Sequence, residues 1–281
     1  MDTIKQELFN ELTSFAQSLN TAISTQDGQW TIKGFIDIYK NIYTISSDTK
    51  IVSKILEIHL FPHLLRFAEQ HGYAIVLPQY QNYYPDISFV NMQNEAIKFA
   101  VDFKTTYKSL DYPGFCTGFT LGSHGEYFVN RESTKNIQFP YKDYLSHFCL
   151  GIIYTRSEKQ IDETKTYPIS QLHSIASVVN DFQFFVAEKW QIASDKRGSG
   201  NTANIGSISK INDIVNSRGM FSRLGESWFD DYWMNYGKIF LKSESGKTRK
   251  ITNLIDFVKY RGGDVNLIVP KARRRKAKRG K

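Results

Sequence analysis

The chain has 281 residues, of which 41% are hydrophobic and 14% aromatic, which is enough to bury the core of one large domain, or of one domain with a small appendage. No run of eighteen apolar residues occurs and the first residues lack an apolar signal core, so we expect neither a membrane span nor a secretory signal. Cys116 and Cys149, the two cysteines, lack metal-site spacing, which is typical of reduced thiols in a cytoplasmic protein.

The formal net charge of +8 is concentrated at the end of the chain. Of 36 basic and 28 acidic residues, residues 271–281 hold eight basic ones and no acid, so residues 1–270 hold 28 basic residues against 28 acidic. A basic tail binds polyanions in general, but a disordered, solubilising end is an equally good interpretation. The net charge therefore says nothing about the folded body.

The first quarter of the chain predicts two helices with a strand between them. Residues 1–20 carry apolar side chains at helical spacing, and residues 35–39 have a strand-like composition. A second helix is expected to begin at Ser47 as N-cap, to bend or restart at Pro62 and to end at Gly72.

Short apolar runs then alternate with polar turns. We expect strands at 74–77, 87–90, 96–104, 149–154 and 182–192, a helix at 141–147, and a linker at 243–250. Strands interleaved with helices predict an α/β sheet domain and not a helix bundle or a sandwich.

Two acids and a lysine, Asp86, Asp102 and Lys104, stand on apolar backgrounds within this strand region. Asp102 and Lys104 fall on one face of their strand because strand side chains alternate between faces. If the preceding turn centres near Asn94, Asp86 lies opposite Asp102 across a hairpin. Two adjacent carboxylates repel each other, and a divalent cation such as Mg²⁺ removes that repulsion. The lysine could then hold or deprotonate a water, or stabilise a phosphorane-like transition state. A solvated surface hairpin explains the same spacing.

The spacing Pro85-Asp86, fifteen residues, Asp102-Phe103-Lys104 resembles the PD-(D/E)xK nuclease signature, and the chain is similar in particular to the EcoRV-type type II restriction endonucleases. Further matching stretches follow in the same order, over roughly two thirds of the chain: Ser47-Asp48-Thr49-Lys50, Gln81 to Asp86, Asp102 to Tyr107, Phe119-Thr120-Leu121-Gly122, Thr134-Lys135-Asn136-Ile137, Gly198-Ser199-Gly200-Asn201-Thr202, Asn204 to Ile208 and Asp231-Tyr232-Trp233. Several short sequence segments that occur in the same order identify a family more specifically than any single motif does.

The resemblance implies a restriction-endonuclease-like core with a mixed β-sheet flanked by helices, followed by a basic tail. Residues 1–242 would form the catalytic and DNA-binding domain, 243–270 a C-terminal extension and 271–281 a disordered tail. It also implies a cytoplasmic homodimer that cleaves double-stranded DNA with Mg²⁺ and is paired with a cognate DNA methyltransferase. The implied target is a short palindrome, GATATC, cut at its centre to leave blunt ends with 5′-phosphates.

The resemblance also assigns roles to residues. Asp86 and Asp102 would be catalytic metal ligands, Lys104 the catalytic lysine, and Glu57 an auxiliary catalytic acid and metal ligand, although an acid on an apolar helix can simply face solvent. Asp48 and Lys50 match residues near the active site, but an exposed first helical turn explains them equally well.

DNA contacts are implied for the remaining matched positions: Gly198, Ser199, Gly200, Asn201, Thr202, Gln81, Asn82, Lys135, Thr105 and Thr106. An asparagine such as Asn201 can contact adenine bidentately in the major groove, and amides such as Gln81 and Asn82 can enter the minor groove. Without the resemblance, a mobile glycine-rich loop is the better interpretation of the stretch from Gly198; with it, base recognition is. The chain has Ala203 where the family pattern has threonine, and Met234 where it has arginine.

Two rival functions use the same residues. A repair or junction nuclease would share the metal site but would select DNA structure and not base sequence. A DNA-binding protein without catalysis would have no use for the set of Asp86, Asp102 and Lys104. Neither a His/Cys metal cluster nor a phosphate-binding P-loop occurs in the sequence, which makes zinc hydrolases and P-loop ATPases poor candidates.

Overall fold

The computed structural model describes residues 2–158, 161–198, 203–242 and 248–273. Its helices are α1 Asp2–Ile23, α2 Thr49–Gln70, α3 Glu126–Val129, α4 Ile211–Val215, α5 Glu226–Met234 and α6 Leu254–Tyr260. Its strands are β1 Gly34–Ile36, β2 Asn41–Thr44, β3 Tyr73–Val76, β4 Ile87–Asn91, β5 Lys98–Tyr107, β6 Thr120–Ser123, β7 Tyr144–Arg156, β8 Thr166–Pro168, β9 Val179–Glu188, β10 Ala193–Arg197, β11 Asn204–Ser207, β12 Phe240–Lys242 and β13 Thr248–Lys250.

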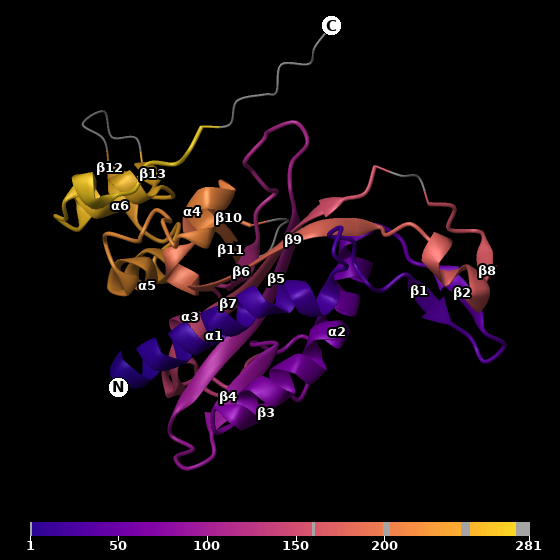
Figure 1. Cartoon of the computed structure of the whole chain (residues 1–281). Coiled ribbons are helices and arrows are strands. Elements are labelled where there is room, and N and C mark those ends of the chain that lie inside the picture. Colours follow the sequence, from indigo (N-terminus) through magenta and orange to yellow (C-terminus); the bar gives the residue numbers. More distant parts are fainter. Residues whose placement is uncertain (1, 159–160, 199–202, 243–247, 274–281) are drawn as a thin grey trace, which may run out of the picture.

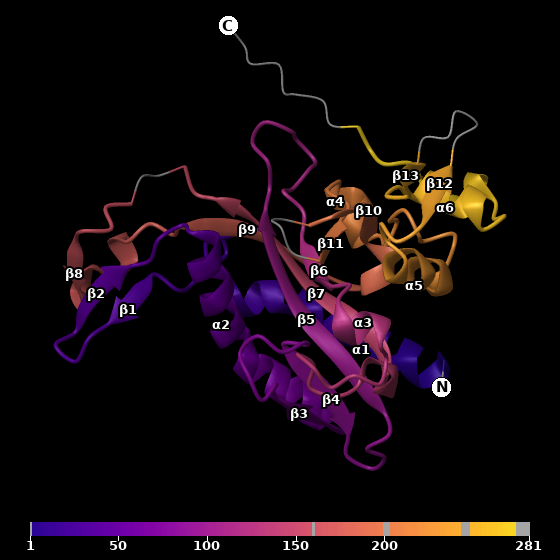
Figure 2. The same cartoon turned by 180° about the vertical axis from the view of Figure 1, so that it is seen from behind.

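A five-stranded mixed sheet in the order β3-β4-β5-β7-β9 forms the centre, with β5 and β7 parallel and the other pairs antiparallel. Figures 1 and 2 show α1 and α2 on one face of this sheet. The mixed α/β fold with helices flanking the sheet confirms the predicted fold class. Two smaller sheets flank the central one, in the orders β10-β11-β6 and β1-β2-β8.

Both faces of the central sheet are buried, each in its own apolar cluster. Phe99, Val101 and Phe103 of β5 pack into the cluster formed with α1 and α2. The intervening Ala100 belongs to a second cluster, which contains residues of β11, α5 and α6. The strict alternation along β5 follows from the period of two of a strand, and it directs Asp102 and Lys104 away from the α1–α2 layer.

The second helix differs in two details from its prediction. Asp48, and not Ser47, is the N-cap, because its carboxylate accepts from the backbone N–H groups of Lys50 at 2.9 Å and Ile51 at 3.3 Å. The helix also runs without interruption past Pro62 to Gln70. An acidic cap fits the first turn well, because the unpaired N–H groups there carry partial positive charge.

The predicted helix at 141–147 is wrong. Residues Tyr141–Asp143 form one 3₁₀ turn, and β7 begins at Tyr144 and pairs along its length with β5 and β9. β7 is an interior strand buried on both faces, and the polar residues Ser146 and His147 near its start are buried too, so its first residues lack the alternation that identifies a half-exposed strand. The strand predicted at 182–192 is also shifted. As β9, it begins earlier, at Val179, and ends at Glu188, and residues Lys189–Gln191 form a 3₁₀ turn.

The C-terminal region is more ordered than the predicted linker. Residues Thr248–Lys250 form β13, which pairs with β12, while 243–247 lie outside the described residues. Leu254, Phe257 and Val258 of α6 are buried in the same apolar cluster as α5. The division of the chain near residue 242 stays a prediction. Of the basic tail, only residues 271–273 lie within the described part of the chain.

Candidate active site and DNA-binding cleft

The β4–β5 hairpin brings the two predicted acids together. Its register pairs Ile87 with Val101, so the turn is centred on Asn94 and Asp86 faces Asp102, as the spacing predicted. The backbone N–H of Asp86 donates to Oδ1 of Asp102 at 3.3 Å, and the backbone N–H of Phe103 donates to Oδ2 of Asp86 at 2.7 Å. Each carboxylate is thus tied to the strand that carries the other.

A difference in strand length opens the cleft beside this hairpin. The ladder between β4 and β5 ends at the Ile87–Val101 pair, whereas β5 continues along β7 as far as Tyr107. The residues of β5 beyond Val101 therefore line a cleft and not another strand.

Lys104 lies next to the acids and carries a well-supported positive charge. Its ammonium is 2.5 Å from Oδ2 of Asp102, whose side chain is 7% exposed. Burial opposes the charge of Lys104, but the attraction of Asp102 and Asp86 outweighs burial and raises the pKa of this lysine. Burial first, and then the nearby Asp102, raise the pKa of Asp86 to about 8.

The two carboxylates fit a divalent cation such as Mg²⁺. Asp86 and Asp102 are forced close together by the register, and the raised pKa of Asp86 reports charge repulsion and burial that a cation would relieve. Magnesium is commonly held by one or two carboxylates together with waters and substrate phosphates. Within the described residues, no three acidic, histidine or cysteine side chains come close enough to hold one ion together.

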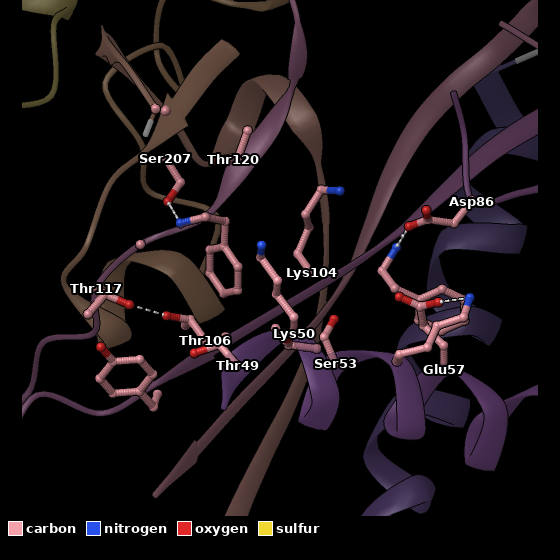
Figure 3. Close-up of a pocket in the computed structure, with 18 of the residues that line it drawn as sticks. Thr49, Lys50, Ser53, Glu57, Asp86, Lys104, Thr106, Thr117, Thr120 and Ser207 are labelled. Atoms are coloured by element: carbon pink, nitrogen blue, oxygen red, sulfur yellow. Dashed lines mark hydrogen bonds and ion pairs between the residues drawn. The ribbon is translucent and has the colours of Figure 1, made fainter. Parts of the chain in front are cut away.

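Glu57 lies in the same cavity as Asp86 and Lys104 but is engaged elsewhere. Its carboxylate forms an ion pair with Lys54 at 2.8 Å, one turn earlier on α2. Figure 3 shows Glu57 on the helix below Asp86, while the side chain of Lys104 extends into the cavity. A role for Glu57 as a metal ligand stays a proposal.

Two adjoining cavities meet at the acids and the lysine. The larger, of about 1050 Å³, lies between the start of α2, β5, and the small sheet β10-β11-β6, and its lining includes Lys50, Ser53, Thr120, Arg197 and Ser207. The smaller, of about 360 Å³, is lined by Asp102, Asn136 and Asn204, among others. Both cavities are lined by Asp86, Lys104 and Gln81, so the candidate catalytic residues lie where the two cavities join.

The predicted DNA-contacting residues are distributed unevenly over these cavities. The larger one is lined by Gln81, Thr105, Thr106 and Gly198, and the smaller one by Asn82. Lys135 is exposed and lines neither cavity. Ser199, Gly200, Asn201 and Thr202 lie outside the described residues. The ends of that segment are placed, because the backbone N–H of Gly198 donates to the Asn204 carbonyl at 2.9 Å, which joins β10 to β11 at the cavity wall.

An aromatic cluster behind the acids was missed at the sequence level. The hydroxyl of Tyr84, two residues before Asp86, lies 3.0 Å from Nδ1 of buried His147, and its ring stacks on Tyr127 at 5.4 Å. Lys189 is 2% exposed, and its ammonium lies 5.0 Å from the Tyr84 ring and has no hydrogen-bond partner within the described residues. Burial lowers the pKa of Lys189 to about 8 despite the attraction of Asp102. No local pattern marks these residues, because they come from separate strands and turns.

The cationic side of the cleft was also mostly missed. Arg197 and Lys54 line the larger cavity together with Lys50, which the sequence placed near the site. The one local signal was that Arg197 directly precedes the glycine-rich stretch at Gly198. With Lys104, the larger cavity has four cations against two acids, Glu57 and Asp86, so it can attract a polyanion even though residues 1–270 carry no formal net charge.

Comparison with known proteins decides the family. Residues 26–262 match the family model described as restriction endonuclease EcoRV. The chain belongs to the EcoRV restriction endonuclease family. The chain is also 37% identical over 224 residues to the type II restriction enzyme EcoRV of Escherichia coli, an alignment that covers 79% of this chain and 89% of that enzyme.

As a member of the EcoRV family, the protein is a type II site-specific deoxyribonuclease whose substrate is DNA, and enzymes of this kind use a divalent metal. The hydrolase chemistry and DNA binding predicted from the sequence are thereby confirmed. Among the described residues, no helix is both long and apolar enough to cross a membrane. The match ends at residue 262, so the segment that follows lies beyond the EcoRV family pattern.

Proposed function

We propose that the protein hydrolyses phosphodiester bonds of double-stranded DNA with Mg²⁺ at the palindrome GATATC, cutting at its centre to leave blunt ends with 5′-phosphates. The observation that carries the proposal is the meeting of Asp86, Asp102 and Lys104 at the junction of two cavities, one of which reaches Gly198 at the start of the glycine-rich segment. Chemistry and base reading would then act on one DNA strand in one cleft.

Asp86 and Asp102 would hold the metal, with Glu57 as an auxiliary acid across the larger cavity. When bound, the ion would neutralise the paired carboxylates, activate a water and stabilise charge on the phosphate. Lys104 is a cation whose raised pKa keeps it protonated in the free enzyme, so it is suited to stabilise the negative charge that develops on the scissile phosphate. The hydrogen bonds between the two strands keep both acids in place before DNA arrives.

The segment from Gly198 to Thr202 would read the bases, with Asn201 as the adenine contact. Gln81 and Asn82 would approach the minor groove. The DNA backbone or adjacent groups would be contacted by Thr105, Thr106 and Lys135. Ala203 cannot supply the hydroxyl of the family's threonine. Its carbonyl accepts from the His124 N–H at 2.7 Å, which ties the end of the segment to the residue after β6. The Ala203 backbone thus makes a hydrogen bond, although its side chain cannot make a polar contact.

A palindromic target favours a homodimer, because a twofold protein presents the same residues to both half-sites. A surface fit for this role is the small sheet β1-β2-β8, which projects to one side of the body in Figures 1 and 2. Large apolar side chains are exposed on or beside it, led by Ile38 at 87%, Tyr39 at 78%, Ile36 at 58% and Phe35 at 56%. Apolar patches of this kind mark interaction sites on soluble proteins. We assign this sheet to the subunit interface.

The deciding experiment is digestion of a defined plasmid that carries GATATC together with sites altered at single base pairs, with Mg²⁺ and with EDTA. The expected result is one Mg²⁺-dependent double-strand cut at GATATC, with both ends sequenced to the central step. Cleavage at branched or damaged DNA without sequence preference would instead indicate a repair or junction nuclease. Binding without any cleavage at every metal tested would indicate a non-catalytic protein.

The interface has its own test. Ile38→Asp places a charge in the exposed apolar patch, so sedimentation should show monomers where the wild type is a dimer, with double-strand cutting strongly reduced. Ile255→Asp is the matched control, because Ile255 is also exposed, at 51%, but lies on α6 outside the patch. A monomeric wild type, or an Ile38→Asp variant that stays dimeric, would contradict the assignment. A cytoplasmic protein of this activity also requires a DNA methyltransferase that protects GATATC in the same cell.

A further inference from the structure

A third hollow lies beside the DNA cleft, at the root of the basic tail. It has a volume of about 390 Å³, and three of its lining residues, Thr117, Arg197 and Ser207, also line the larger cavity of the active-site cleft. The remaining lining residues are Ser194, Lys196, Ser209, Lys271 and Ala272. The hollow is therefore a continuation of the recognition side of the cleft toward the C-terminal segment.

The C-terminal segment is fixed at this position by packing and hydrogen bonds. Ile268 is 8% exposed and belongs to the apolar cluster that includes α5 and α6. Its carbonyl accepts from the guanidinium of Arg223 at 3.3 Å, and the Val269 N–H donates to the Met220 carbonyl at 3.3 Å. The following residues, Pro270 to Ala272, are thereby led to the edge of the hollow.

The charges around the hollow suit an anion. Its lining contains three basic side chains and no acidic one among the described residues. The ammonium of Lys196 is directed to the Thr252 carbonyl at 3.3 Å and lies 4.0 Å from Asp195, so it is already engaged. Arg197 and Lys271, both exposed, face the hollow from two separate segments of the chain. Two cations that line one hollow can bind a phosphate group together.

We propose that Arg197 and Lys271 bind a backbone phosphate of the DNA that flanks the target, so that the C-terminal segment beyond residue 262 extends the DNA-binding surface. This inference rests on the proposed cleavage of DNA in the adjoining cleft. Arg197 lines both cavities, so DNA bound in the larger cavity beside Gly198 would lie next to this hollow. Six of the last eight residues of the chain are also basic.

The test compares the salt dependence of binding for two duplexes that carry GATATC, one ending close to the target and one extending well past it on both sides. Removing one phosphate-binding cation reduces the slope of log affinity against log salt by about 0.9. Lys271→Ala should therefore weaken binding to the long duplex several-fold and flatten its slope, while binding to the short duplex, the cut position and single-turnover cleavage stay as in the wild type. Deletion of residues 271–281 should have the same effect in larger measure.

Lys259→Ala is the matched control, because Lys259 is an exposed lysine on α6 that lines neither the cleft nor the hollow. If Lys271→Ala and Lys259→Ala change the slope equally, the assignment is wrong. If Lys271→Ala weakens the short duplex as much as the long one and slows cleavage, Lys271 belongs to the catalytic complex and not to a flanking site. Failure of the proposed function would appear separately, as a wild type that does not prefer GATATC. In that case, the effect of Lys271→Ala on binding to a long duplex of scrambled sequence would still test the hollow.

Discussion

The two walls of the DNA cleft are built differently. The proposed catalytic wall consists of β4, β5 and the start of α2, and the proposed recognition wall consists of β6, β10 and β11. On the catalytic wall, an uninterrupted antiparallel register and two backbone hydrogen bonds hold Asp86 and Asp102. On the recognition wall the strands are four or five residues long, and both pairings contain a register shift.

The proposed roles of the two walls account for this difference. A metal site needs its carboxylates placed to within a fraction of an ångström, which a regular ladder provides. Base reading needs backbone that can approach DNA closely, which a glycine-rich connection between short strands provides. Gly206 of β11 meets a different demand, the close pairing with β10, because a Cβ there would lie 2.6 Å from the Lys196 carbonyl oxygen. Changes on the catalytic wall should thus affect rate, and changes on the recognition wall should affect choice of sequence.

The largest effect is expected from removing a group of the catalytic wall. Asp86→Ala, Asp102→Ala and Lys104→Ala should each reduce single-turnover cleavage by orders of magnitude, because one such group commonly contributes about 3–4 kcal/mol to the transition state. Calorimetric titration should show that the two aspartate variants lose Mg²⁺ binding, whereas Lys104→Ala largely keeps it. Circular dichroism serves as the folding control. An Asp102→Ala enzyme that cuts at a near wild-type rate would refute the metal-site assignment.

A smaller and more selective effect is expected on the recognition wall. Asn201→Ala should lose about 1–3 kcal/mol of discrimination at one base pair in each half-site, since a bidentate contact to adenine would be removed. Non-specific binding, which depends on phosphates, should change little. The measurement is the ratio of kcat/KM for GATATC and for its single-base variants. Equal weakening on every sequence would show that Asn201 supports the fold or touches the backbone, and would remove the proposed contrast between the walls.

The smallest effect concerns the stability of the metal-free catalytic wall. The pKa of Asp86 is raised from 3.8 to about 8, so between these pH values the folded state binds more protons than the unfolded state. The free energy of unfolding therefore falls as the pH rises through this window. Asp86→Asn removes the titrating group and should stabilise the metal-free protein at pH 7 by about 1 kcal/mol or more, with little change below pH 4.

Thermal unfolding across this pH range, with EDTA and then with Mg²⁺, measures the effect. The wild type should be stabilised by Mg²⁺ more strongly at pH 8 than at pH 6, because binding to Asp86 requires its deprotonated form. Asp213→Asn is the control, since Asp213 is an acid of α4 that lies outside the cleft and is ion-paired with Lys210. If the stability of the wild type and of Asp86→Asn depends equally on pH, the Asp86 carboxyl is not the group that causes this dependence.

The sequence by itself determined the local features whose cause is local. The alternation of apolar residues along 96–104 predicted which face of β5 carries Asp102 and Lys104. The number of residues between the two acids predicted that the turn is centred on Asn94 and that Asp86 lies opposite Asp102. The order of the matched stretches indicated the family that the comparisons then showed. These features depend on the period of a strand and on hairpin geometry, which the order of residues fixes directly.

Only the tertiary structure decided the features that join distant segments. The strand at 144–156 was mistaken for a helix at its start because a strand covered on both faces shows no periodicity. Packing between elements far apart in the chain places three further features: buried Lys189 beside Tyr84, the cations Lys54 and Arg197 in the cleft, and Lys271 at the edge of the cleft. A charge count could not find them, because equal numbers of acids and bases in residues 1–270 still leave a cationic cleft once folding separates them in space.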